Sequence, residues 1–488
     1  MSRIGGLGHV AAVVVLGAGL VVAAARVPSS ALDLSSAAPQ AAPPTRPVTA
    51  AQLVCPGPET LQGTGDETAA APAFVAAATA PATTSVTTSG RLRATTVPAG
   101  EQPPVQLFGS PATAGSVTSA ASVDVTASGP SAAGLVASQL TVVPSGDLRG
   151  LSGTACTAPS TDAWLVGGGG DDGRRGRIVL TNVAPNPVDA SVHVLSADGR
   201  VDHTASASVT VPAHGRSTVL LGALAPSVTS PVVHVTTTGG TVTATLHDSW
   251  LHGTTAWGTD DVSAGVPPSR TVLVPGVAVA GAALVRIAVP GAAEAVAQVR
   301  LLGPGGEVVA PENGVVRVPA GSSRDLDLSR LPAGTYGVEV TADVPVVAGA
   351  LVERRADQAG PDGVRDLAWL ASAPPLTGAE HVLGVAGVTA NRTDLTATLA
   401  LTAPAGAAAV ELVSGTSAPT TVQVPAGTTK VVTVPADQPT FVRATTGSGP
   451  VVAARLLTAP TPQGELITAS ALAPAPVVQH LTSLTPAS

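Results

Sequence analysis

The chain has 488 residues, a formal net charge of −8 and 11% charged residues, against about 25% in ordinary globular domains. Aromatic residues are 2% of the chain, so a hydrophobic core must be built from Val, Ala and Leu. The acidic balance, without any run of basic residues, argues against nucleic-acid binding. Apolar residues make up 44% of the chain, which together with so little charge argues against disorder and predicts a folded body.

An apolar run from Val10 to Ala25, preceded by Arg3, opens the chain. A positive start, an apolar core and small residues at its end are typical of an export signal. Extended back to Ile4, the run has about 22 residues, enough for a membrane-spanning helix. We therefore expect residues 1–26 to be a signal peptide or membrane anchor and residues 27–50 a flexible stalk. The remainder should be extracytoplasmic, either anchored in the cytoplasmic membrane or secreted.

Four copies of one phrase divide the rest of the chain into repeats. They are Val97-Pro98-Ala99-Gly100, Val211-Pro212-Ala213-His214, Val318-Pro319-Ala320-Gly321 and Val424-Pro425-Ala426-Gly427. The gaps of 114, 107 and 106 residues between them indicate one supersecondary unit used repeatedly. Because proline cannot donate to a strand ladder, each phrase is predicted to be a corner where a strand ends. The expected β modules are residues 51–160, 161–268, 269–366 and 367–488.

Strand signals recur within each repeat and are clearest in the second. Short apolar or alternating runs predict strands at residues 177–182, 191–195, 206–211, 217–221, 232–235 and 241–246. Turns every 8–12 residues or so are typical of antiparallel sandwiches. The predicted fold is all-β, a tandem array of about four immunoglobulin-like antiparallel β-sandwich modules after an N-terminal membrane helix. In such an array, neighbouring modules touch mainly each other. The alternative is a β-propeller in which each repeat supplies two four-stranded blades.

Cys55 and Cys156 are the only cysteines and lie at the two ends of the first repeat. A disulfide between them is expected in an oxidising compartment. Closing a loop of about 100 residues is worth roughly 4–5 kcal/mol in the chain-entropy model. The alternative is two free, buried thiols.

The first repeat opens at Cys55-Pro56-Gly57-Pro58, a second cysteine follows, and the later repeats are rich in Val, Pro and Gly. In these features the whole chain resembles a family of exported, membrane-anchored actinobacterial proteins of unknown function. The resemblance implies a cell-envelope setting in a GC-rich Gram-positive organism. It carries over no catalytic residue.

Six of the nine histidines lie in the second repeat: His193, His203, His214, His234, His247 and His252. Imidazole is a common metal ligand, but these residues occupy different predicted strands and turns, at no ligand spacing. Scattered surface histidines are therefore the favoured interpretation. Asp171 and Asp172, after the glycines 167–170, offer too few oxygens for calcium, which takes about six to eight. We expect no catalytic residue, cofactor or metal site.

The tryptophans separate two functional hypotheses. Trp250 and Trp257 lie near the end of the second repeat, where they could flank a sugar-binding groove, whereas the repeat-opening positions of Trp164 and Trp369 indicate packing. The favoured hypothesis is a non-enzymatic scaffold of the cell envelope, structural or protein-interacting. Its partners would be envelope proteins or wall glycan, and its N-terminal helix would contact the membrane. The alternative is an accessory protein that binds cell-wall polysaccharide.

Overall fold

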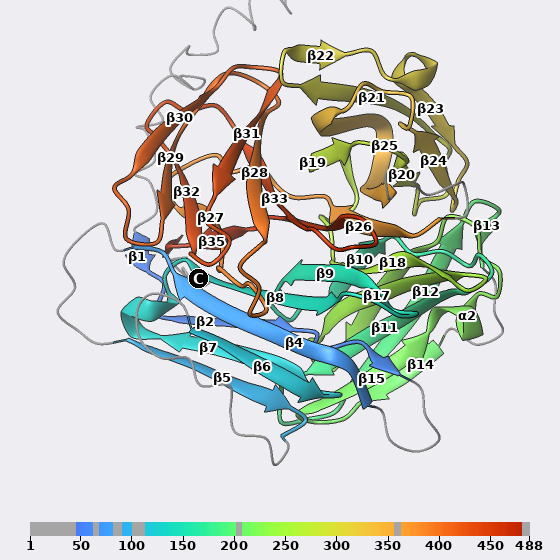
Figure 1. Cartoon of the computed structure of the whole chain (residues 1–488), viewed down its shortest axis with the longest axis horizontal. Helices are drawn as coiled ribbons and strands as arrows, with labels where there is room; N and C mark the ends of the chain where they lie inside the picture. Colours follow the sequence, from blue (N-terminus) through green and yellow to red (C-terminus); the bar gives the residue numbers. More distant parts are fainter. Residues whose placement is uncertain are drawn as a thin grey trace, which may run out of the picture. The chain divides into compact units, whose positions relative to one another are not determined.

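The computed structural model describes residues 45–61, 68–81, 90–99, 113–201, 207–355 and 363–480, so the predicted signal or anchor lies outside the described residues. Residues 46–479 form one compact unit. Within the described ranges the chain is all-β, with a short helix α2 (Leu221–Leu224) and the 3-10 turns η3 (Gly129–Ala132) and η4 (Pro311–Gly314) (Figure 1). No helix in this part of the chain has the length and apolarity to cross a bilayer.

Each repeat contributes an inner sheet with the same strand order. The order is β6 (Thr113–Ser119), β4 (Thr68–Thr79), β8 (Leu135–Val143), β9 (Gly150–Ala155) in the first repeat, where β3 (Thr60–Leu61) also pairs with β4. It is β15 (Gly215–Leu220), β11 (Arg174–Asn182), β17 (Thr243–His252), β18 (Thr255–Val262) in the second. In the third it is β24 (Ser323–Asp327), β20 (Ala283–Ala288), β25 (Gly334–Arg355), β26 (Arg365–Ala371). In the fourth it is β31 (Thr428–Val434), β28 (Thr396–Ala403), β33 (Val452–Ala459), β34 (Leu466–Ala471).

A second, outer sheet belongs to each repeat. The first comprises β2 (Ala50–Cys55), β7 (Ser122–Ser128) and β5 (Arg91–Val97). The second comprises β10 (Asp162–Val166), β16 (Val232–Thr238), β12 (Val188–Ser196), β13 (Gly199–Arg200) and β14 (Ala207–Val211). The third comprises β19 (Ser269–Val279), part of the long β25, β21 (Ala295–Gly303), β22 (Gly306–Val308) and β23 (Val315–Val318). The fourth comprises β35 (Pro474–Pro476), β27 (His381–Val385), β32 (Thr440–Ala444), β29 (Ala408–Ser414) and β30 (Thr420–Val424), and β1 (Thr45–Pro47) pairs with β36 (Val478–His480).

The last strands of the four inner sheets form a closed cycle of contacts. β9 contacts β18, β18 contacts β26, β26 contacts β34, and β34 contacts β9. The labels of β9, β18 and β26 lie near the middle of Figure 1. Among the described strands, these four are not joined to one another in any ladder. The contact between β34 and β9 joins the fourth repeat to the first, which a linear array of modules that touch mainly their neighbours does not predict. The propeller stays an alternative.

Hydrophobic cores cross three boundaries between repeats. Leu367 and Trp369 of the third repeat lie in the core of the second. Leu456 of the fourth repeat lies in the core of the third, and Leu140 of the first lies in the core of the fourth. Burial of apolar surface stabilises by about 25 cal/mol per Å². Each of these repeats therefore depends on its neighbour for part of its stability, and an isolated module would lack part of its core.

Every Val-Pro-Ala phrase ends a strand, as predicted. β5, β14, β23 and β30 end at Val97, Val211, Val318 and Val424. At the fourth position of the second, third and fourth copies the backbone turns left-handed, with φ of 45° at His214, 65° at Gly321 and 69° at Gly427. Glycine adopts such angles freely, whereas a residue with a Cβ is strained there.

Replacing His214 with glycine should therefore stabilise the protein by about 0.5–1 kcal/mol, read as a higher urea midpoint. The reciprocal control is Gly321→His, at the same position of the third repeat, where a Cβ would meet no atom within 4 Å. That variant should lower the midpoint through backbone strain alone. A lower midpoint for His214→Gly would contradict the strain argument.

Candidate functional site

Asp366 of β26 lies fully buried, at 0% exposure, where the four inner strands meet. Its Oδ2 accepts hydrogen bonds from the backbone N–H of Leu151 in β9 (3.1 Å) and of Ile467 in β34 (2.8 Å). The approach requires a glycine in β18, because a Cβ on Gly258 would lie 2.6 Å from Asp366 Oδ1. One carboxyl group thus connects three strands that no ladder joins.

Asp260 of β18 is a second fully buried carboxyl group at the same junction. Its Oδ1 accepts from the N–H of Gly153 in β9 (3.2 Å) and from Thr468 Oγ1 of β34 (2.8 Å). Its Oδ2 accepts from the N–H of Trp369 in β26 (2.8 Å). Asp260 therefore contacts all three of the other inner strands.

Burial dominates the electrostatics of this junction. Desolvation raises the pKa of Asp366 to about 8, and the nearby Arg149 guanidinium opposes the rise. Desolvation and the neighbouring charge of Asp261 raise the pKa of Asp260 well above its ordinary value. Arg149 is itself buried and donates to the carbonyl oxygens of Arg365 (3.0 Å) and Gly464 (2.9 Å). The junction is a set of polar groups that fasten strands through their backbone.

A second buried cluster fastens the second repeat to the third. Asp248 accepts from Arg174 Nε (3.0 Å) and Nη2 (2.6 Å) and from the indole Nε1 of Trp369 (2.8 Å). Arg286 lies 5.2 Å from the centre of the Trp369 ring, within the range of a cation–π contact. Its guanidinium is held by both oxygens of Asp325, at 2.8 and 3.0 Å. Trp369, predicted to open the fourth repeat, lies in the last strand of the third repeat's inner sheet.

Cys55 and Cys156 are joined in a disulfide, with their Cα atoms 4.4 Å apart. Both side chains are buried in the core of the first repeat, and no free cysteine occurs among the described residues. The alternative of two free thiols is thereby excluded.

The histidines of the second repeat do not converge. His234 stacks on Trp164 with ring centres 3.8 Å apart, and His193 lies 6.2 Å from His234. His203 lies outside the described residues. His247 is 3% exposed, and its Nδ1 is hydrogen-bonded to Asp261. Surface placement was therefore wrong for His247. In the part of the chain that the structure describes, no group of three His, Cys, Asp or Glu side chains could hold a metal ion.

Trp250 and Trp257 pack against each other instead of flanking a groove. Their rings meet edge to face at 4.6 Å. Trp257 is buried, with His252 stacked at 4.0 Å and the Arg365 guanidinium 3.6 Å from the ring centre. A sugar ring would need one of these faces to be open, and the structure covers the indole of Trp257.

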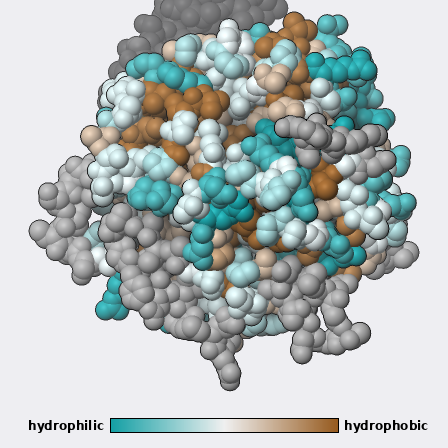
Figure 2. Space-filling view, in the orientation of Figure 1, coloured by the Kyte–Doolittle hydropathy of each residue, from teal (hydrophilic) through white to brown (hydrophobic). Residues whose placement is uncertain are grey.

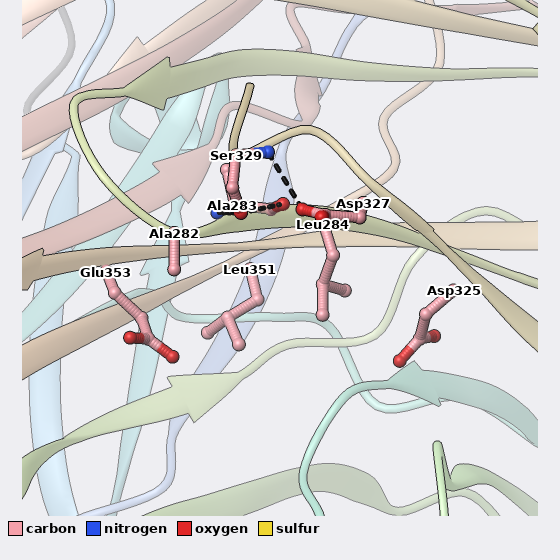
Figure 3. Close-up of a pocket in the computed structure, with 8 residues that line it drawn as sticks. All are labelled: Ala282, Ala283, Leu284, Asp325, Asp327, Ser329, Leu351 and Glu353. Atoms are coloured by element: carbon pink, nitrogen blue, oxygen red, sulfur yellow. Dashed lines mark hydrogen bonds between the residues drawn. The ribbon is translucent and has the colours of Figure 1, made fainter. Parts of the chain in front are cut away.

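A small hollow of about 150 Å³ lies beside β20, lined by Ala282, Ala283, Leu284, Asp325, Asp327, Ser329, Leu351 and Glu353 (Figure 3). Its carboxylates are already engaged: Asp327 accepts the Ser329 N–H at 2.8 Å, Asp325 pairs with Arg286, and Glu353 pairs with Arg365 at 2.9 Å. Ligand pockets for small molecules usually measure about 300–1,000 Å³. The hollow is too small for such a ligand.

Comparison with known proteins gives one family. A model described as a family of unknown function (DUF5719) matches residues 109–435. No curated protein matches the chain.

Proposed function

The chain thus belongs to a family of unknown function, and from this premise we propose that it is a non-enzymatic scaffold of the cell envelope. In this proposal, four rigid immunoglobulin-like β-sandwich repeats present a surface to partner proteins. The supporting observation is the use made of the buried polar groups. Asp260, Asp366 and Arg149 bind the backbone of other repeats, an arrangement that fixes sheets to one another.

Export is part of the proposal. The disulfide between Cys55 and Cys156 supports an oxidising compartment, and the apolar run at the start of the sequence would serve as signal or anchor. The described body would then lie outside the cytoplasmic membrane, tethered or secreted.

A single thiol tests this location. Val309, 78% exposed, offers a labelling position, and the two native cysteines are paired. Val309→Cys should react with a membrane-impermeant maleimide on intact cells, to the same extent as after lysis. A cytoplasmic cysteine protein serves as the control for cell integrity. Labelling of Val309→Cys only after lysis would refute export.

Among the described residues, few large hydrophobic side chains are exposed. Figure 2 shows one face, on which hydrophobic residues are interspersed with hydrophilic ones. The exposed large hydrophobic side chains of the described residues are Val296, Val309, Val315 and Val431. Three of them lie on or next to β21–β23. A protein partner is expected to contact this outer sheet of the third repeat.

Cross-linking in envelope fractions separates the scaffold from the polysaccharide-binding alternative. The scaffold proposal expects specific proteins to be captured, and expects the purified protein not to sediment with purified wall glycan. Sedimentation with glycan, unaffected by Trp257→Ala, would identify a binding face elsewhere and favour the alternative.

A further inference from the structure

The boundary between the first and second repeats differs from the other three in its chemistry. The second, third and fourth repeats share hydrophobic clusters with their neighbours, and the fourth shares one with the first. Within the described residues, no hydrophobic cluster contains side chains of both the first and the second repeat. Three boundaries are therefore apolar and this one is polar.

The contact between these two repeats, here called the seam, includes side-chain hydrogen bonds and one ion pair. Glu59 of the first repeat accepts from Arg177 Nη1 (2.6 Å), Ser249 Oγ (3.1 Å) and Thr259 Oγ1 (3.2 Å) of the second. Ser122 Oγ lies 2.7 Å from Thr181 Oγ1, and Thr154 Oγ1 lies 2.6 Å from Ser263 Oγ. Every one of these groups would be hydrated if the seam separated.

Closure of the seam leaves polar atoms buried without a partner. Arg177 Nε is one of them. His247 and Asp261, which share a strand face with Ser249 and Thr259, contribute His247 Nε2 and Asp261 Oδ2. An unsatisfied buried polar atom costs about 1–3 kcal/mol, more when charged. Burial of an ion pair such as Glu59–Arg177 also carries a desolvation penalty that its attraction barely repays.

Few backbone hydrogen bonds cross the boundary between these two repeats. Ser160 and Val242 exchange two, at 2.9 and 3.0 Å, beside the point where the chain passes from the first repeat to the second. The N–H of Gly153 bonds across the seam to Asp260, but Thr468 Oγ1 of the fourth repeat also accepts from it, at 2.9 Å. The first repeat keeps its apolar attachment to the fourth through Leu140 and Leu151. The second keeps its attachment to the third through Trp369.

We propose that the cycle of repeats is a conformational device that opens at the seam, exposing the polar face of β11, β17 and β18 while the three apolar boundaries stay closed. The population of a locally opened state falls as the free energy of the contacts that must break rises. The seam has the smallest apolar contribution, so it is the boundary that separates first.

A matched pair of buried serines tests the proposal in the full chain. Ser122, 0% exposed, faces the second repeat across the seam, and Ser138, 1% exposed, accepts the N–H of Ala386 in the fourth repeat. Each is replaced by cysteine, and labelling by a small thiol reagent is followed without denaturant. Ser122→Cys should label at least about tenfold faster than Ser138→Cys, because a buried thiol reacts in proportion to the open population. Thr181→Cys, on the opposite side of the seam, should also be fast.

A third substitution distinguishes opening from damage. Glu59→Gln removes one partner of the buried ion pair, so it should accelerate labelling of Ser122→Cys and leave that of Ser138→Cys unchanged. Circular dichroism and the urea midpoint establish that each variant is folded. Equal labelling rates at Ser122→Cys and Ser138→Cys, or rates that share the urea dependence of whole-chain unfolding, would overturn the proposal.

Discussion

Replacing Trp369 with alanine should lower the free energy of unfolding by about 3–5 kcal/mol, the range for deleting a buried aromatic side chain. Trp369 is 2% exposed and belongs to the third repeat, yet it packs in the core of the second. Its indole N–H also donates to the buried Asp248. The substitution therefore leaves a cavity and weakens a boundary between repeats at the same time.

The measurement is urea unfolding of the full chain, followed by circular dichroism. Trp369→Phe should recover part of the loss, because it restores apolar volume without the indole N–H. Val309→Ala, at an exposed position, should change the stability by less than about 0.5 kcal/mol. Equal effects of Trp369→Ala and Val309→Ala would show that the boundary contributes nothing.

Local structure was largely predictable from the sequence. In the second repeat, the predicted strands at 177–182, 191–195 and 232–235 lie within observed strands β11, β12 and β16. The disulfide followed from the number and positions of the cysteines. These features depend on short-range patterns or on composition, which a sequence displays directly.

The sequence did not predict β18, the strand whose Asp260 contacts the other three inner strands. Its residues Gly258, Thr259, Asp260 and Asp261 are typical of a turn, yet all four are buried. Neighbouring repeats supply the hydrogen bonds of Thr259 and Asp260, whose partners lie 107 to 208 residues away along the chain. Asp261 bonds to His247 of its own repeat. Alternation of apolar and polar residues does not reveal a strand whose buried side chains are themselves polar. His247 was misplaced for the same reason, since the first repeat covers its face of β17.

Asp366→Asn should change how stability depends on pH. Burial raises the pKa of Asp366 to about 8, so the folded state binds this proton more tightly than the unfolded state does. The resulting stabilisation is complete below about pH 4, where the unfolded group is also protonated. It is lost as the pH rises through 8, by at most about 1.4 kcal/mol per pH unit. Asparagine is neutral throughout, so the variant lacks this decline.

The expected result is that the unfolding free energy of Asp366→Asn, relative to the wild type, rises between pH 5 and pH 8. The substitution also places an amide group where Asp366 Oδ1 has no hydrogen-bond partner. This lowers the unfolding free energy by the same amount at every pH, so it does not alter the slope. Asp327→Asn is the matched control, because hydrogen bonds from Ser329 lower the pKa of Asp327 and its titration falls below this range. Parallel curves for Asp366→Asn and the wild type would mean that Asp366 is already ionised at the junction. The four inner strands would then be fastened by a charge instead of a proton-bearing carboxyl group, and Arg149 would be the group that compensates it.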